Sequence, residues 1–298
     1  MQAKNEDSLS GLGFALSAYL MWGFLPLYMK ALDHFPPTEV IAHRVIWSIP
    51  VAFAVLLATG RTRDLKAALL NPRMLAMGVV TASLIGINWG FYIWAITSGN
   101  AMEAALGYYI NPLFSIFLAA VFLRERLSTA QWSAIALSVA AVVVLTVEAG
   151  RLPAQGLVMT LTWGLYAYFK KSLPIGPNQA FTLEILLLTP FALAYITYLI
   201  ISGESHFLTE TTRDTWLLLG AGPVSAIPLI IYANGAKRLR LSTIGILQYV
   251  APTLIFLVAV FIFHEPFGQA QLIAFSMIWT ALVIYTVSML RGARKAGR

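Results

Sequence analysis

The sequence contains no cysteine among its 298 residues. This absence excludes disulfide bonds, thiolate-ligated zinc, thiol catalysis and lipid anchors attached to cysteine. The chain also lacks the Walker A pattern G-x-x-x-x-G-K-[ST], and the loops between its apolar runs are too short for a nucleotide-binding domain. We therefore expect no cofactor, and no direct use of ATP.

Charged residues are also scarce. They make up 11% of the chain, whereas hydrophobic residues make up 59%. Ordinary soluble domains are roughly 25% charged, so a soluble fold of this composition would lack polar surface. The sequence therefore predicts an integral membrane protein.

Apolar runs long enough to cross a bilayer recur throughout the chain. The first is too long for a signal-peptide core and is interpreted as a retained helix. Because the runs are continuous, they predict helices rather than the alternating strands of a membrane barrel. The fold class is all-α, with ten predicted spans at 9–29, 38–59, 74–97, 102–123, 129–147, 154–171, 179–201, 214–236, 242–263 and 268–290.

The Lys and Arg residues show which way the helices run. If the N-terminus is cytoplasmic, sixteen of the 20 Lys and Arg lie in cytoplasmic segments. Only Lys30, Arg151 and Arg213 lie outside, and Arg44 lies within a span. This asymmetry predicts both termini in the cytoplasm. It also accounts for the net charge of +7 without a nucleic-acid partner.

The sequence matches itself at a shift of 140 or 141 residues. The string GYYINPLFSIFLAAVFLRERLS (107–128) corresponds to QYVAPTLIFLVAVFIFHEPFG (248–268). The matched pairs are Tyr109 with Tyr249, Pro112 with Pro252, Glu125 with Glu265, and Trp22-Gly23 with Trp163-Gly164. A near-constant offset across several helices indicates an internal repeat.

Each repeat, 1–148 and 149–298, holds five spans, and five is an odd number. The second repeat must therefore cross the membrane in the opposite sense to the first. Inverted repeats around a central cavity are typical of secondary transporters, whose substrate site lies between the halves. Ten helices can enclose a cavity alone, so we expect a monomer.

Several strings resemble the RarD branch of the EamA family, within the drug/metabolite transporter superfamily. They are AHRVIWS (42–48), GINWGFYIWA (86–95), MEAALGYYINPL (102–113) and RLRLSTIGILQYVAPTL (238–254). The likeness covers almost the whole chain. It implies ten helices, a bacterial inner-membrane location, and transport, generally export, of small metabolites or drugs such as chloramphenicol.

Pro112 and Pro252 break helical hydrogen bonds in matching places. Each proline lacks a donor and interferes with the carbonyl four residues earlier, at Tyr108 and Gln248. Freed carbonyls at membrane depth require protein or cavity water. We interpret the prolines as paired kinks at the cavity and the alternative as packing kinks. The predicted polar walls are Tyr108, Tyr109, Asn111, Gln248 and Tyr249.

Arg44 and Glu184 are charged residues about six positions inside their spans, related by the shift of 140. A charge near a helix centre costs about 2.5–3.5 kcal/mol on insertion scales. With a rise of ~1.5 Å per residue they lie roughly 15 Å apart in depth, too far to pair. We expect Arg44 to pair with Glu103 as an outer gate or substrate contact. Glu184 is an inner coupling candidate near Lys170, Lys171, Lys237 or Arg238; snorkelling and structural pairing remain the alternative.

Aromatic residues mark a second set of candidates. Most aromatic side chains in membrane proteins lie at the interface or face lipid. Trp22 and Trp163 differ because both lie mid-span beside a glycine. Asn88, Trp89 and Tyr92 lie at spacings that can share one helix face. We predict that Trp22, Asn88, Trp89, Tyr92 and Trp163 face the cavity.

Glu125 and Glu265 follow the fourth and ninth spans, and Ser128 with Gln131 fits a capping box. We interpret these residues as structural.

The predicted function is therefore gradient-driven transport of small amino-acid-like or aromatic solutes across the inner membrane. The proton is the candidate coupling ion, and the bilayer is the expected surrounding. The alternatives are a metabolite importer acting by uniport or exchange, a channel, or a membrane-embedded enzyme. The last is disfavoured because the spans contain no HExxH, no G-x-S-x-G and no acidic or His cluster.

Overall fold

The computed structural model describes residues 8–60, 62–123, 127–172, 175–209, 211–236, 238–239 and 247–296. All regular structure in these ranges is helical. The helices are α1 (Leu9–Lys30), α2 (Pro37–Thr59), α3 (Thr62–Leu70), α4 (Pro72–Thr97), α5 (Ala101–Leu123), α6 (Thr129–Ala149), α7 (Ala154–Ser172), α8 (Pro177–Ser202), α9 (Thr212–Ala236), α11 (Val250–Leu257), the π-helical turn η1 (Val258–Ile262) and α12 (Gln269–Ala296).

Nine of the ten predicted ranges contain one continuous helix that starts within two residues of the predicted start. The short helix α3 was not predicted. Leu65 and Ala68 on this helix are buried, in a cluster with Leu56 and Leu183. The start of the ninth range, up to residue 246, lies outside the described residues; in the described remainder, α11 begins at Val250 and continues as the π-helical turn η1.

Local sequence signals explain several helix ends. The predicted capping box is confirmed: the Ser128 hydroxyl accepts from the Gln131 N–H, and the Gln131 side chain accepts from the Ser128 N–H. The helices α2, α6 and α8 end at Gly60, Gly150 and Gly203. All three glycines adopt positive φ, a conformation that glycine adopts without a steric penalty.

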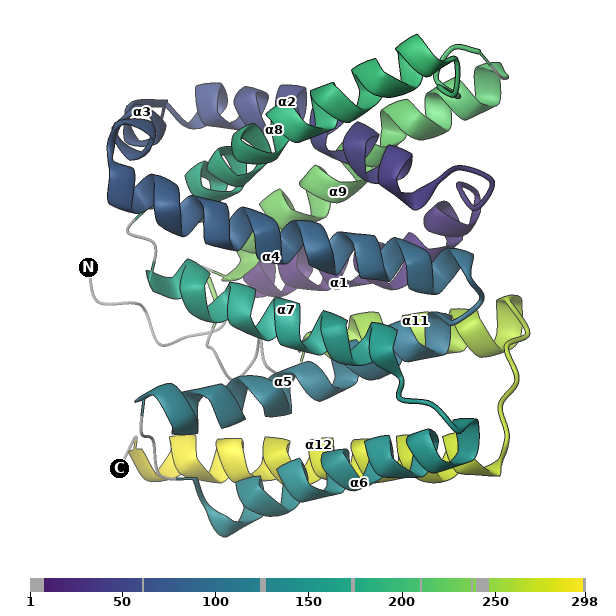
Figure 1. The fold of residues 1–298 in the computed structure, drawn as a ribbon. Coiled ribbons are helices and arrows are strands. Elements are labelled where there is room, and N and C mark those ends of the chain that lie inside the picture. Colours follow the sequence, from purple (N-terminus) through teal and green to yellow (C-terminus); the bar gives the residue numbers. More distant parts are fainter. Residues whose placement is uncertain are drawn as a thin grey trace.

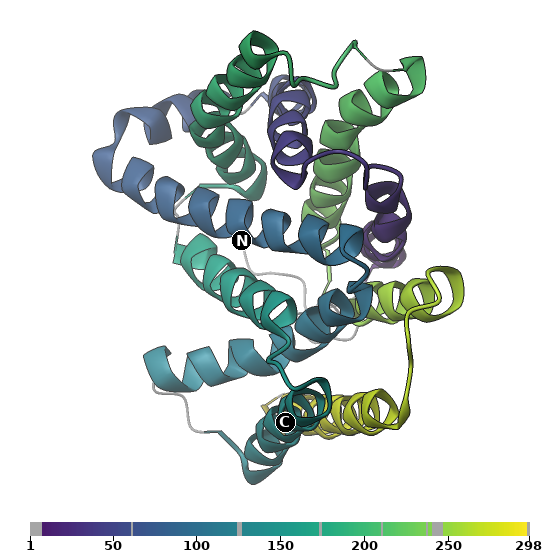
Figure 2. The same cartoon turned by 45° about the vertical axis from the view of Figure 1, so that its right-hand side comes forward.

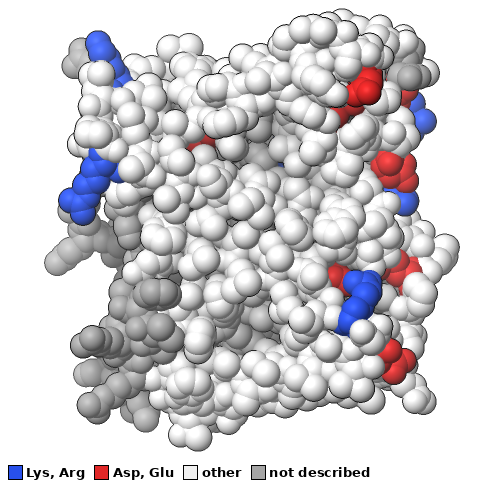
Figure 3. All heavy atoms as spheres, in the orientation of Figure 1, with Lys and Arg blue, Asp and Glu red and all other residues white. Residues whose placement is uncertain are grey.

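Seven of the described helices are long and apolar enough to cross a membrane: α1, α2, α4, α6, α8, α9 and α12. In addition, α5 has 23 residues and α7 has 19, and some side chains of both helices lie outside the described part. On the face drawn in Figure 3, most charged residues lie toward two opposite edges, with a broad uncharged surface between them. This arrangement is that of a multi-pass membrane protein.

The main helix contacts join residues before Gly150 to residues after it. The helix α6 packs against α12, α2 against both α8 and α9, α5 against α7 and α11, α4 against α7 and α8, and α1 against α9 and α11. Figures 1 and 2 show α6 and α12 side by side at one end of this arrangement. In Figure 1 the end of α12 and the helix α3 lie at the same side of the molecule. The two halves of the chain are thus interleaved.

Glycine allows two of these contacts to be very close. A Cβ atom on Gly222 of α9 would lie 2.1 Å from the Trp47 carbonyl carbon of α2. A Cβ atom on Gly107 of α5 would lie 2.5 Å from the Gly156 carbonyl oxygen of α7. Small residues at such crossings let helix backbones approach in membranes.

Candidate central binding site

Arg44 of α2 is buried between α4 and α9, with a side chain that contacts both. Its Nε–H donates to the Ser225 hydroxyl of α9 at 2.5 Å. Its guanidinium carbon lies 4.3 Å from the centre of the Trp89 ring of α4. Its Nη1 is buried without a hydrogen-bond partner among the described residues. One face of the cation is therefore held by the protein, and one nitrogen is left to donate.

A row of aromatic rings extends from the neighbourhood of Arg44. Tyr92 of α4 and Tyr108 of α5 both interact electrostatically with Arg44. The ring centres of Tyr92 and Tyr108 are 6.0 Å apart, and those of Tyr108 and Trp163 are 6.2 Å apart. Trp163 then lies 5.7 Å from Tyr166, both on α7. The row therefore links three helices.

The row ends at a carboxylate. The Tyr166 hydroxyl donates to Oε2 of Glu184 on α8 at 3.0 Å, and Glu184 is 1% exposed. A buried acidic group and a buried basic group thus lie at opposite ends of one aromatic row. We call the following residues the central polar cluster: Arg44, Asn88, Trp89, Tyr92, Tyr108, Trp163, Tyr166, Glu184 and Ser225.

Two further polar atoms of the cluster are buried without a hydrogen-bond partner among the described residues. The Asn88 amide nitrogen donates to the Met159 carbonyl and the Thr162 hydroxyl, both at 3.0 Å, but its Oδ1 has no partner. The Tyr92 hydroxyl also has none. Buried polar groups are rarely left unpaired, because doing so costs about 1–3 kcal/mol each. Such groups are what a solute-binding site presents.

Sequence reasoning placed Arg44, Asn88, Trp89, Tyr92, Tyr108 and Trp163 at the cavity and gave Glu184 as an inner coupling candidate; the structure brings all of these residues into one cluster. It overlooked Ser225 and did not select Tyr166 from the aromatics of the second half. Tyr166 is three residues after Trp163, a spacing that shares a helix face. Ser225 follows Ala221 by four residues, in the small-xxx-small pattern of helix crossings.

Other predicted wall residues lie elsewhere. Tyr109 is buried against α11 and α12, where its hydroxyl lies 2.8 Å from that of Thr253 and its ring lies 6.0 Å from Phe275. Trp22 lies in a separate aromatic group with Tyr19 and Tyr232, each 5.5 Å away.

Three more predicted wall residues lie on α5 and in the turn before α11. Asn111 lies at the α5–α7 crossing, near Gly164. Gln248 and Tyr249 are half-buried in the turn before α11, and the Tyr249 hydroxyl has no hydrogen-bond partner among the described residues.

The expected pairing of Arg44 with Glu103 is wrong. Glu103 instead forms an ion pair with Arg151 at 3.1 Å, because both lie near the connection between α6 and α7. Of the cations expected near Glu184, Arg238 instead donates to the Ser10 hydroxyl at 3.2 Å. The side chains of Lys170, Lys171 and Lys237 lie outside the described residues.

The two prolines lie at different places in their helices. Pro112 lies inside α5, as predicted. Pro252 is the third residue of α11, where the backbone nitrogen of an α-helix has no intrahelical acceptor. Before it, Leu247 is helical and Gln248 and Tyr249 form a turn, while residues 240–246 lie outside the described part of the chain. Whether Pro252 kinks a longer helix stays a prediction.

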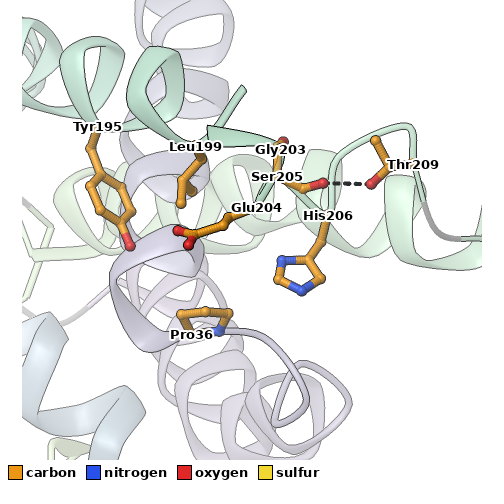
Figure 4. Close-up of a pocket in the computed structure, with 8 residues that line it drawn as sticks. All are labelled: Pro36, Tyr195, Leu199, Gly203, Glu204, Ser205, His206 and Thr209. Carbon is orange, nitrogen blue, oxygen red and sulfur yellow. Dashed lines mark hydrogen bonds between the residues drawn. The ribbon is translucent and has the colours of Figure 1, made fainter. Parts of the chain in front are cut away.

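A pocket lies at the α8–α9 connection, and none of its lining residues belongs to the central polar cluster. Its volume is about 450 Å³, and Figure 4 shows the lining side chains. Beside it, Glu39 is fully buried and accepts from the backbone N–H of His206 at 3.0 Å. The His206 ring nitrogen Nδ1 lies 2.7 Å from the same carboxylate. These contacts attach the start of α2 to the connection.

Within the described ranges, no group of three or more His, Asp or Glu side chains is arranged to hold a metal ion.

Comparison with known proteins agrees with this architecture. Residues 9–147 match the model of the EamA-like transporter family. The chain is 40% identical over 296 residues to a protein named Protein RarD from Streptomyces exfoliatus, covering 99% of this chain and 94% of that protein. The chain belongs to the EamA-like transporter family. It is a membrane transporter of the RarD type.

Two more relatives of this EamA transporter are informative. Chloramphenicol-sensitive protein RarD from Pseudomonas aeruginosa is 34% identical, with 97% of this chain and 98% of that protein covered. A solved crystal structure with 22% identity superposes with a TM-score of 0.62 and covers 95% of this chain and 99% of that chain. At that identity the likeness concerns the fold alone.

Proposed function

We propose that this EamA transporter is a secondary exporter of small amphipathic solutes that carry a carboxylate and an aromatic or apolar part. The observation that carries the proposal is the buried Arg44, fixed by Ser225 and Trp89 with Nη1 left to donate. Guanidinium groups bind carboxylates strongly in sites shielded from water. The row from Tyr108 to Trp163 offers ring faces to the rest of the solute.

Glu184 sets the other end of the proposed site. A solute with both a carboxylate and an ammonium group, such as an amino acid or its derivative, would match one basic and one acidic end. An aromatic drug would use the ring faces and the unpaired oxygen of Asn88. Amino-acid-like compounds are therefore the first class to test, and amphenicols are the second.

Alternating access in this proposal depends on two inverted repeats of five helices around the central site. The packing pattern supports them, because exchanging the halves maps one helix pair onto another. The pair α2 with α9 maps onto α8 with α4, and the pair α1 with α11 maps onto α7 with α5; all four pairs are in contact.

The matched glycines support the repeats at the level of single residues. A Cβ atom on Gly23 of α1 would lie 2.5 Å from Leu254 of α11. A Cβ atom on Gly164 of α7 would lie 2.5 Å from Phe114 of α5. Leu254 and Phe114 are themselves 140 positions apart. Each Trp-Gly pair thus packs on the equivalent site of the opposite half.

The distribution of Lys and Arg supports an orientation with both termini in the cytoplasm of a bacterial cell, in the inner membrane. In this orientation α3 and the end of α12 lie at the cytoplasmic side. We propose that the protein acts as a monomer, driven by solute exchange or by protons with Glu184 as the titrating group.

Counterflow in proteoliposomes tests the proposal. Vesicles are loaded with unlabelled amino acids, vitamins or amphenicols, and uptake of the same labelled compound is measured. We expect saturable exchange of at least one compound and a loss of about tenfold or more in Arg44→Ala, since hydrogen bonds to charged groups are worth about 1.5–3 kcal/mol. The matched control is Arg213→Ala, which removes an exposed arginine.

The alternatives give different results. Conduction that never saturates would indicate a channel, and net uptake without exchange would indicate a uniporter. No movement of any panel compound under several gradients would contradict the exporter, as would equal rates in Arg44→Ala and the wild type.

A further inference from the structure

Glu265 joins two helices that are distant in the sequence. It lies in the connection between η1 and α12, and only 8% of its surface is exposed. Its Oε1 accepts from the backbone N–H of Ala101 at 2.5 Å, and its Oε2 accepts from that of Met102 at 2.9 Å. These are the first two residues of α5. One carboxylate therefore caps the start of a helix 164 positions away.

The start of α5 lacks a side-chain cap of its own. The first N–H groups of any helix have no intrahelical acceptor. Asn100 precedes α5 and is a favoured capping residue type. Its Oδ1, however, accepts from Arg151 at 3.3 Å, and its Nδ2 donates to Ser98. Glu265 takes over this role and adds a negative charge at the positive end of the helix dipole.

The backbone before Glu265 is unusual at two places. The helix α11 turns into the π-helical segment η1, a feature often found at functional sites. His264 has a φ of 54°, in the left-handed region that non-glycine residues rarely adopt. Such conformations are strained and persist where surrounding contacts hold them. Here the turn directs the carboxylate of the next residue onto α5.

The position of this contact connects it with the central site. Helix α5 carries Tyr108, about two turns beyond the capped end, and α11 packs across α5 at the hydrogen bond between Tyr109 and Thr253. Between the cap and this crossing lies a cavity of about 210 Å³, lined in part by Glu103, Leu106 and Glu265. Leu106 is 1% exposed.

We propose that Glu265 is a latch, which holds the first turn of α5 to the segment after α11 and keeps this end of the transporter closed. When the carboxylate leaves the two N–H groups, α5 is free to move relative to α11, and solvent enters the cavity at Leu106. The latch rests on the proposed alternating-access function, in which α5 moves with its residue Tyr108.

The native absence of cysteine allows a direct test. Leu106→Cys is introduced as the only thiol, and its labelling by a membrane-impermeant maleimide is timed in spheroplasts. Glu265→Ala in this background is expected to raise the labelling rate by roughly tenfold, the effect of losing a helix cap. The matched control, Glu148→Ala, removes an exposed carboxylate near the end of α6 and is expected to leave the rate unchanged.

A second reporter separates release from unfolding. Ala281 on α12 is fully buried, so Ala281→Cys is expected to stay unlabelled with and without Glu265 if the fold is intact. Glu265→Gln removes the charge but keeps one acceptor oxygen, and it is expected to label Leu106→Cys more slowly than Glu265→Ala does. Equal labelling of Leu106→Cys in Glu265→Ala and Glu148→Ala would overturn the latch. So would a rise that Ala281→Cys shares.

The assay requires no solute, so it fails separately from the transport proposal. Faster labelling in Glu265→Ala, in a protein that transports no compound, would support the latch and contradict the export proposal. Saturable counterflow with unchanged labelling would support the export proposal and contradict the latch.

Discussion

Arg44 and Ser225 lie 181 positions apart in the chain, yet the guanidinium Nε–H donates to the serine hydroxyl at 2.5 Å inside the protein. The contact forms because α9 approaches α2 at Gly222, one turn before Ser225, where the Ser48 hydroxyl also donates to the Gly222 carbonyl at 3.2 Å. A glycine crossing thus places a hydroxyl from one half beside the cation of the other. The binding properties of Arg44 depend on both halves.

Arg44→Lys is expected to reduce counterflow almost as much as Arg44→Ala. A lysine keeps the charge but lacks the planar group that lies over Trp89 and the second nitrogen that donates outward. We expect counterflow to fall by about tenfold, in line with roughly 1–2 kcal/mol for a desolvated cation–π contact. Arg213→Lys is the control. Wild-type rates in Arg44→Lys would show that only the charge of Arg44 matters.

Tyr108 and Tyr109 are expected to separate transport from stability. Tyr109→Phe removes the hydrogen bond to Thr253 and should lower stability by about 1 kcal/mol with little change in solute affinity. Tyr108→Ala removes a ring of the aromatic row and should weaken solute binding in addition to any stability lost with the packed ring. Thermal unfolding in detergent and half-saturating solute concentrations are the two measurements. A reversed pattern would mean that Tyr109 faces the solute.

Glu184→Gln tests whether a titrating group drives transport. A glutamine still accepts from the Tyr166 hydroxyl, so the protein should remain folded. We expect solute exchange to persist and its response to an imposed pH gradient to disappear. Tyr166→Phe is the companion variant, because it removes the hydrogen bond but keeps the carboxyl. A gradient response that survives in Glu184→Gln would place proton coupling elsewhere.

Gly222→Ala is expected to destabilise the protein. The added methyl group would collide with the α2 backbone at Trp47 and Ser48, and overpacking of this kind costs about 1–3 kcal/mol. Gly13→Ala on α1 is the matched control, since its added atom would meet nothing within 4 Å. The yield of monodisperse protein after solubilisation measures the difference. Equal yields would show that α9 can shift without loss.

Low pH is expected to favour the latched state, in which Glu265 accepts from the N–H groups of Ala101 and Met102. Burial raises the pKa of Glu265, while the N–H donors of Met102 and Ala101 and the charge of Lys30 act in the opposite direction, and Glu103 adds to the rise. The latched carboxyl thus binds a proton more readily than one in water, so protonation favours the latched state. As the pH falls, labelling of Leu106→Cys should decrease relative to an exposed thiol at Val147→Cys. Faster labelling of Leu106→Cys at lower pH would contradict this prediction.

Much of the fold was predictable, because helix length and end signals are local properties. Nine predicted ranges contain single helices, and the Ser128 capping box and Pro112 lie where the pattern put them. The helix that was not predicted depends on its partners. The amphipathic helix α3 is too short for a span, and its Leu65 and Ala68 are buried in a cluster with Leu56 and Leu183.

The candidate site was predictable only in part. Arg44, Asn88 and Glu184 stand out because polar groups are costly in hydrocarbon. The partner of Arg44 could not be predicted from its depth in the membrane. Glu103 forms an ion pair with Arg151, and Arg44 donates a hydrogen bond to the neutral Ser225 instead. Likewise, Glu265 looked like an ordinary residue after a helix until its contact with Ala101 and Met102 was known.

The sequence by itself determined that this chain lies in a membrane as apolar helices, and which residues are costly to bury there. These properties follow from composition and run length, and they need no knowledge of contacts. Only the tertiary structure decided which face of each helix meets which neighbour. Tyr108 and Tyr109 point about 100° apart on α5. Because the helix is apolar all round, hydrophobicity does not choose between them; the crossing helices do.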